Sequence, residues 1–140
     1  MTTPLSLKTL MWVALGGALG AMLRVILGEF THGFFHENSP MSFPFSIVIV
    51  NIIGSMYLGL AAALVEQGIW QPRQLWIQGS GIAGALTTFS AMAAVAVEFW
   101  LNQNYLALVS FLLVQLIVGL VFCYLAMRLV VYIYLNFKRE

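Results

Sequence analysis

GIAGALTTFSAM, residues 81–92, is the stretch of sequence that decides the fold, because it lies inside an apolar run long enough to cross a lipid bilayer. Its glycines and β-branched threonines make it the weakest helix-forming part of any such run in the chain. Lipid offers no water to unpaired backbone groups, so this stretch must either pack its small face on a neighbouring helix or break and line a polar cavity. At a break, freed carbonyl groups could bind a cation and the N–H groups of the next half-helix could bind an anion.

The composition is that of an integral membrane protein. Of the 140 residues, 61% are hydrophobic and 8% are charged, which is far more apolar than an average soluble domain. We predict a single transmembrane domain over residues 1–140, because too little polar sequence remains for a second core. The net charge of +1 gives no reason to expect nucleic acid or another charged macromolecule as a partner.

Four apolar runs predict an all-α protein with four transmembrane helices in the lipid bilayer. The runs cover roughly residues 8–28, 44–65, 75–99 and 104–135, and each approaches or exceeds the ~20 residues that a spanning helix needs. Tryptophan and tyrosine cluster towards the ends of the runs, as interfacial aromatic residues do.

The distribution of basic residues predicts the orientation in the membrane. An even number of crossings places both termini on one side, together with the connection between the second and third runs. That side collects Lys8, Arg73, Arg128, Lys138 and Arg139. Only Arg24 lies towards the other side, so the positive-inside rule predicts cytoplasmic termini.

Arg24 shares one helix stripe with three glycines, Gly16, Gly20 and Gly28, which are spaced at intervals of four residues. Small residues at this spacing let helix backbones approach closely, so we expect the stripe to face protein rather than lipid. Two interpretations of the arginine stay open: its side chain extends to the headgroups at the end of the run, or it forms a cationic vestibule for an anion.

Asn51 and Gln115 are the informative amide side chains of the second and fourth runs. In a membrane such an amide needs hydrogen-bond partners, and a packing bond between helices satisfies that need as well as a pore does. An amide group can also donate two N–H groups to an anion. Spacing alone leaves both interpretations open.

No constellation of catalytic residues is present, so we do not expect an enzyme. His32 and His36 are four residues apart, but two histidines without a third well-spaced ligand are a weak metal signal. A four-helix multidrug-type exporter would need a carboxylate within the membrane, whereas Glu66 and Glu98 lie at the ends of runs. The pattern favours passive conduction over proton-coupled transport.

Three segments together resemble the CrcB/Fluc family of small fluoride channels: GGALGAMLR at residues 16–24, VNIIGSMYLG at residues 50–59 and GIAGALTTFS at residues 81–90. Their order and spacing and the number of runs all agree with that family, and the resemblance covers nearly the whole chain.

The resemblance implies a passive fluoride-selective channel in the cell inner membrane that confers fluoride resistance. It implies a broken third helix and an antiparallel dimer with two pores, each built from both subunits. Backbone carbonyl groups of Gly84 and Thr87 would hold a structural sodium ion at the dimer centre. The residues it assigns to the fluoride pore are Asn51, Phe89, Ser90, Met92 and Gln115, with Arg24 at the vestibule.

Several positions depart from the family pattern. Met92 stands where a second phenylalanine is usual, and methionine lacks the electropositive ring edge of phenylalanine. The remaining departures are Ser46, Ile47, Ala91, Gly119 and Cys123. Gly119 and Cys123 fall where hydroxyl residues commonly line the anion track, so we expect a less polar track here. These departures, with the one-sided basic charge, leave open a heterodimer with an oppositely inserted partner in place of the homodimer that we favour.

Overall fold

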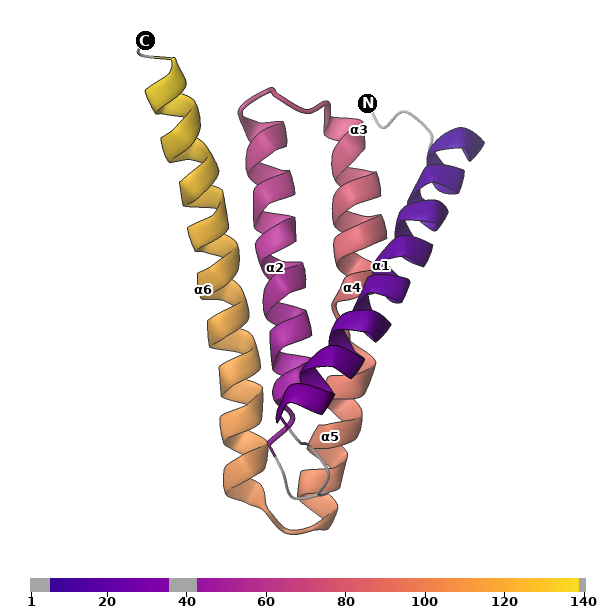
Figure 1. Ribbon diagram of the computed structural model, residues 1–140, viewed down its shortest axis with the longest axis vertical. Coiled ribbons are helices and arrows are strands. Elements are labelled where there is room, and N and C mark those ends of the chain that lie inside the picture. Colours follow the sequence, from indigo (N-terminus) through magenta and orange to yellow (C-terminus); the bar gives the residue numbers. More distant parts are fainter. Residues whose placement is uncertain (1–5, 36–42, 139–140) are drawn as a thin grey trace.

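The computed structural model describes residues 6–35 and 43–138, which form four long helical crossings (Figure 1). Three crossings are single helices: α1 (Leu7–Phe35), α2 (Phe45–Glu66) and α6 (Tyr105–Phe137). The third consists of α3 (Pro72–Leu75), the π-helix η1 (Trp76–Ala83), α4 (Gly84–Leu86) and α5 (Phe89–Leu101). All four are long and apolar enough to cross a membrane, and the described residues contain no strand. The predicted all-α membrane fold is confirmed.

The third crossing is broken at two consecutive threonines. Thr87 ends α4 with φ −70° and ψ 155°, and Thr88 precedes α5 with φ −137° and ψ 112°, so both have extended backbone. Glycine-rich η1 leads into this break with the wider π-helical winding, which is rare and often found at functional sites. The alternative of a straight third helix is therefore wrong.

Glycines set the close packing of α1 against η1. A β-carbon on Gly16 would lie 2.9 Å from the carbonyl oxygen of Ile77, and one on Gly20 would collide with the carbonyl oxygen of Ile82. The predicted stripe therefore faces protein over these two positions. At Gly28 a β-carbon would meet no described atom within 4 Å, so close packing ends before the stripe does.

The helix α2 occupies the centre of the bundle and packs extensively on α6. A β-carbon on Gly59 would collide with the carbonyl oxygen of Cys123, which explains how these two helices approach each other so closely. Farther along, Val48, Phe99 and Phe111 form a buried cluster that joins α2, α5 and α6. The rings of Phe99 and Phe111 meet edge to face at 6.0 Å.

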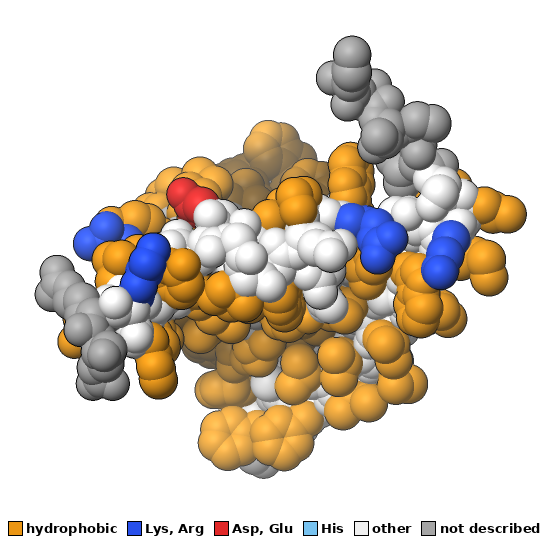
Figure 2. Space-filling model, turned by 90° about the horizontal axis from the view of Figure 1, so that it is seen from above, with side chains coloured by type: hydrophobic (Ala, Val, Ile, Leu, Met, Phe, Trp, Pro, Cys, Tyr) orange, Lys and Arg blue, Asp and Glu red, His pale blue; other side chains and the backbone are white. Residues whose placement is uncertain are grey.

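The start of α1, the end of α6 and the α2–α3 connection lie at the same end of the bundle, as an even number of crossings requires (Figure 1). Lys8 near the start of α1, Arg73 in α3 and Lys138 after α6 belong to this end. Figure 2 shows basic side chains spread across it, above an apolar body. Arg139 and His36, which entered the sequence predictions, lie outside the described residues.

Candidate functional site

Two cavities flank the break in the third crossing. The first has a volume of about 470 Å³, and its wall includes six of the eight residues singled out in the sequence: Asn51, Gly84, Thr87, Phe89, Met92 and Gln115. The second has a volume of about 300 Å³ and contains the other two, Arg24 and Ser90. Thr88 lines both cavities, so the break itself forms the partition between them.

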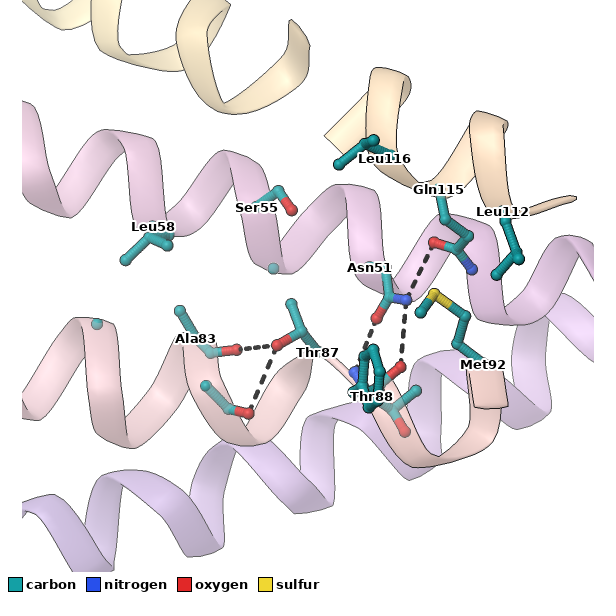
Figure 3. Close-up of a pocket in the computed structure, with 14 residues that line it drawn as sticks. Asn51, Ser55, Leu58, Ala83, Thr87, Thr88, Met92, Leu112, Gln115 and Leu116 are labelled. Atoms are coloured by element: carbon teal, nitrogen blue, oxygen red, sulfur yellow. Dashed lines mark hydrogen bonds between the residues drawn. The ribbon is translucent and has the colours of Figure 1, made fainter. Parts of the chain in front are cut away.

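The break is held open by the side chain of Asn51. Its Oδ1 accepts a hydrogen bond from the backbone N–H of Thr88 at 2.8 Å, and its Nδ2 donates to the carbonyl oxygen of Thr88 at 3.3 Å (Figure 3). Thr88 is only 9% exposed, so water does not replace these partners easily. The amide of Asn51 therefore supplies the bonds that a continuous helix would have made within its own backbone.

Thr88 also starts the second half of the crossing. Its Oγ1 accepts from the backbone N–H of Ala91 at 3.2 Å, which is the usual bond of a threonine N-cap, and lies 3.3 Å from the hydroxyl oxygen of Ser90. This cap satisfies one of the N–H groups that every helix leaves unpaired at its start. The first turn of α5 is thus anchored at the partition between the cavities.

The carbonyl oxygens of Gly84 and Thr87 both lack their helical donors. The amide of Thr88, four residues after Gly84, donates to Asn51, and the amide of Ala91, four residues after Thr87, donates to Thr88 Oγ1. The hydroxyl of Thr87 contacts the Gly84 oxygen only at 3.5 Å. Two carbonyl groups of this kind fit a hard cation such as sodium, which prefers oxygen ligands.

Asn51 also connects the break to α6. Its Nδ2 donates to Gln115 Oε1 at 3.1 Å, so α2, the third crossing and α6 are joined through one amide (Figure 3). The Nε2 of Gln115 is buried and has no described hydrogen-bond partner. Leaving a buried donor unpaired costs about 1–3 kcal/mol. The unpaired Nε2 therefore lowers the free energy of unfolding of the bundle.

Phe89 and Met92 form the side of the first cavity that α5 contributes. The side chain of Phe89 is 77% exposed, so it is not a core residue of this chain. Met92 is partly buried and packs against the cluster of Val48, Phe99 and Phe111. The ring of Phe89 is therefore accessible at the wall of the first cavity.

The second cavity carries a positive charge. Arg24 is partly buried and is the only charged residue in the described wall. The hydroxyl residues Ser46 and Ser90 line the same cavity, as does the apolar Ile47. The arginine thus lies beside this cavity, and its role as a vestibule for an anion stays a prediction.

Some contributions to the site were not anticipated from the sequence. The capping role of Thr88 could have been found, because a threonine immediately before an apolar run is a common helix start. The hydroxyl of Tyr57 donates to Gln78 Oε1 and ties α2 to η1, and no sequence signal indicates this pairing. The apolar part of the wall of the first cavity includes Leu58, Leu112 and Leu116.

Comparison with known proteins shows the family. The family model described as "CrcB-like protein, Camphor Resistance (CrcB)" matches residues 11–127. The chain belongs to the CrcB family. The matched range includes every residue described above at the break and in the walls of the two cavities.

Curated relatives in the CrcB family carry an informative name. A protein of Shewanella sp. (strain W3-18-1) called "Fluoride-specific ion channel FluC" is 33% identical over 118 residues, which are 84% of this chain and 92% of the relative. A protein with the same name from Renibacterium salmoninarum is 35% identical over 126 residues, covering 84% of this chain and 95% of the relative.

Proposed function

We propose that this protein is a fluoride-selective ion channel that lets cytoplasmic fluoride leave the cell passively and so confers fluoride resistance. Membership of the CrcB family and the names of the relatives support this function. The observation that carries it is the donor set of the two cavities: amide and hydroxyl groups, one guanidinium group and an exposed phenylalanine ring, with no carboxylate in either described wall.

Fluoride is a small anion that gives up its water reluctantly, so a selective pore must replace hydration with close donors and still let the ion leave. In the proposed pathway, Arg24 attracts the anion to the second cavity and Ser90 supplies a hydroxyl donor there. The ring edge of Phe89 carries partial positive charge and faces the ion at the first cavity. Amide donors from Asn51 or Gln115 complete that cavity, and Met92 contributes an apolar wall.

The channel is proposed to be an antiparallel dimer with two pores, each drawing residues from both subunits. The exposure of Phe89 and Gly84 supports this arrangement, because a second subunit would cover groups that a lone chain leaves open. A sodium ion at the dimer centre would be held by the carbonyl oxygens of Gly84 and Thr87 from both chains. Such an ion supplies positive charge that neutralises these carbonyl dipoles.

A homodimer and a heterodimer require different orientations of this chain in the membrane. We favour the homodimer, in the inner membrane, with the basic end cytoplasmic in half of the subunits. Labelling single cysteines placed at each terminus of a cysteine-free chain measures orientation. Mixed orientation supports the homodimer, whereas one orientation throughout would require a second, oppositely inserted protein.

The decisive experiment is fluoride efflux from liposomes that contain the purified protein, followed with a fluoride electrode. We expect rapid efflux driven by the membrane potential, and no comparable chloride efflux. An exporter coupled to protons would instead depend on a pH gradient, and a purely structural subunit would give no flux. Either result would overturn the proposed channel function.

A further inference from the structure

We infer that in this chain the amide of Gln115, and not that of Asn51, is the side-chain amide that donates to fluoride in the first cavity. This inference rests on the proposed channel function and assigns separate tasks to two residues of the same site. Asn51 holds the break, and Gln115 presents N–H groups to the ion. The assignment follows from hydrogen-bond chemistry that begins at the backbone of Thr88.

The backbone of Thr88 determines how the Asn51 amide is oriented. A backbone N–H can only donate and a backbone carbonyl can only accept. The atom 2.8 Å from the Thr88 nitrogen must therefore be the oxygen of Asn51, and the atom 3.3 Å from the Thr88 oxygen must be its nitrogen. Exchanging the two atoms would place donor against donor and acceptor against acceptor.

The orientation of Asn51 then determines that of Gln115. One N–H of Asn51 Nδ2 is used by the Thr88 carbonyl, and the other points to Gln115 at 3.1 Å. The group that receives it must be an acceptor, so Gln115 presents Oε1 there and its Nε2 is turned elsewhere. Both N–H groups of Asn51 are consequently occupied, and neither remains for an anion.

The Nε2 of Gln115 is left in apolar surroundings. In Figure 3 it points towards the side chains of Met92 and Leu112, and it is buried without a described partner. These neighbours offer a thioether and methyl groups, which are poor acceptors for an N–H group. An anion in the cavity that Gln115 lines would give this donor the strong acceptor that it lacks.

The two assignments predict opposite effects of Gln115→Met, which matches the size of glutamine but has no donor. This substitution also frees one N–H of Asn51. If Gln115 is the donor, fluoride efflux from liposomes falls at least about tenfold, as expected when a hydrogen bond to a charged group is lost. If Asn51 is the donor, efflux is unchanged or rises, and the inference is wrong.

Two further variants separate donor loss from general damage. Gln115→Ser restores a hydroxyl donor and should recover part of the efflux lost in Gln115→Met. Gln78→Met removes an amide of the same size that bonds Tyr57 and lies outside both cavity walls, so it should keep the wild-type rate. Equal loss in Gln78→Met and Gln115→Met would overturn the inference.

A binding measurement on the wild type covers the case in which a variant fails to fold. In ¹⁵N-labelled protein in detergent, titration with sodium fluoride against sodium chloride should shift the side-chain amide signal of Gln115 more than that of Asn51, which is affected only through its bond to Gln115. A shift of Asn51 alone would overturn the inference while leaving the channel function intact. A wild type that releases no fluoride from liposomes would instead refute the channel function and the inference with it.

Discussion

Asn51 and Thr88 are joined by two hydrogen bonds, one to each backbone polar group of Thr88, at 2.8 and 3.3 Å. The two residues lie 37 positions apart, on different crossings of the membrane. This pairing lets a helix break inside lipid without leaving the backbone of Thr88 unpaired. It also places the carbonyl groups of Gly84 and Thr87 where their usual helical donors are absent.

Removing the Asn51 amide should destabilise the protein. Asn51→Leu leaves the buried N–H and carbonyl of Thr88 without partners, and we expect a loss of about 2–4 kcal/mol in the free energy of unfolding. Thermal unfolding in detergent measures it, with Ser55→Ala on the same helix as a control that should change little. An unaltered unfolding temperature for Asn51→Leu would show that the pairing is dispensable.

Adding a methyl group to Gly20 should separate α1 from η1. Its β-carbon would collide with the backbone of Ile82, which cannot move aside as a side chain could, so Gly20→Ala should cost about 1–3 kcal/mol. Gly17→Ala is the matched control, because no described atom lies within 4 Å of a β-carbon there. The control should be neutral or gain up to about 1 kcal/mol from helix propensity. Similar unfolding temperatures for the two variants would contradict the packing.

Changing Phe89 should affect conduction more than stability. Its ring is 77% exposed in the chain, so Phe89→Leu removes little core packing, yet it removes the ring edge proposed to face fluoride. We expect slower fluoride efflux with little change in unfolding temperature. Phe137→Leu, also at a 77% exposed ring, should keep normal efflux. Undiminished efflux from Phe89→Leu would remove this residue from the pathway.

The N-cap of α5 should depend on the hydroxyl of Thr88. Thr88→Val keeps the shape of the side chain but leaves the amide of Ala91 without its acceptor at 3.2 Å, at a cost of about 1 kcal/mol. Thr88→Ser retains the acceptor and should unfold nearer to the wild type. Comparison of thermal unfolding among the three proteins checks this, and a Thr88→Val protein as stable as Thr88→Ser would argue against the cap.

Sodium should stabilise the folded dimer if the carbonyl oxygens of Gly84 and Thr87 bind it. A ligand at 100 times its Kd stabilises a protein by about 2.7 kcal/mol, so replacing sodium by N-methylglucamine should lower the unfolding temperature. Potassium tests for specificity, because it is larger and should restore less stability. Identical unfolding curves in all three salts would refute the proposed site.

Much of the architecture follows from local sequence. Runs of about 20 apolar residues must cross the bilayer as helices, and their number places both termini on one side. The weakness of residues 81–92 follows from glycine and threonine propensity, which is also a local property. The packing of Gly16 and Gly20 was predictable for the same reason, since a spacing of four defines a helix face.

Tertiary structure decided which neighbours these residues receive. Sequence spacing gave Gly28 the same expectation as Gly20, yet only Gly20 meets a neighbouring backbone. Likewise, the amides of Asn51 and Gln115 were equally suited to packing or to a pore. Their roles depend on partners 37 and 64 positions away along the chain, and only the folded bundle brings those partners within hydrogen-bond distance. A local pattern reveals which groups need partners, whereas the packing of helices determines which partner each one receives.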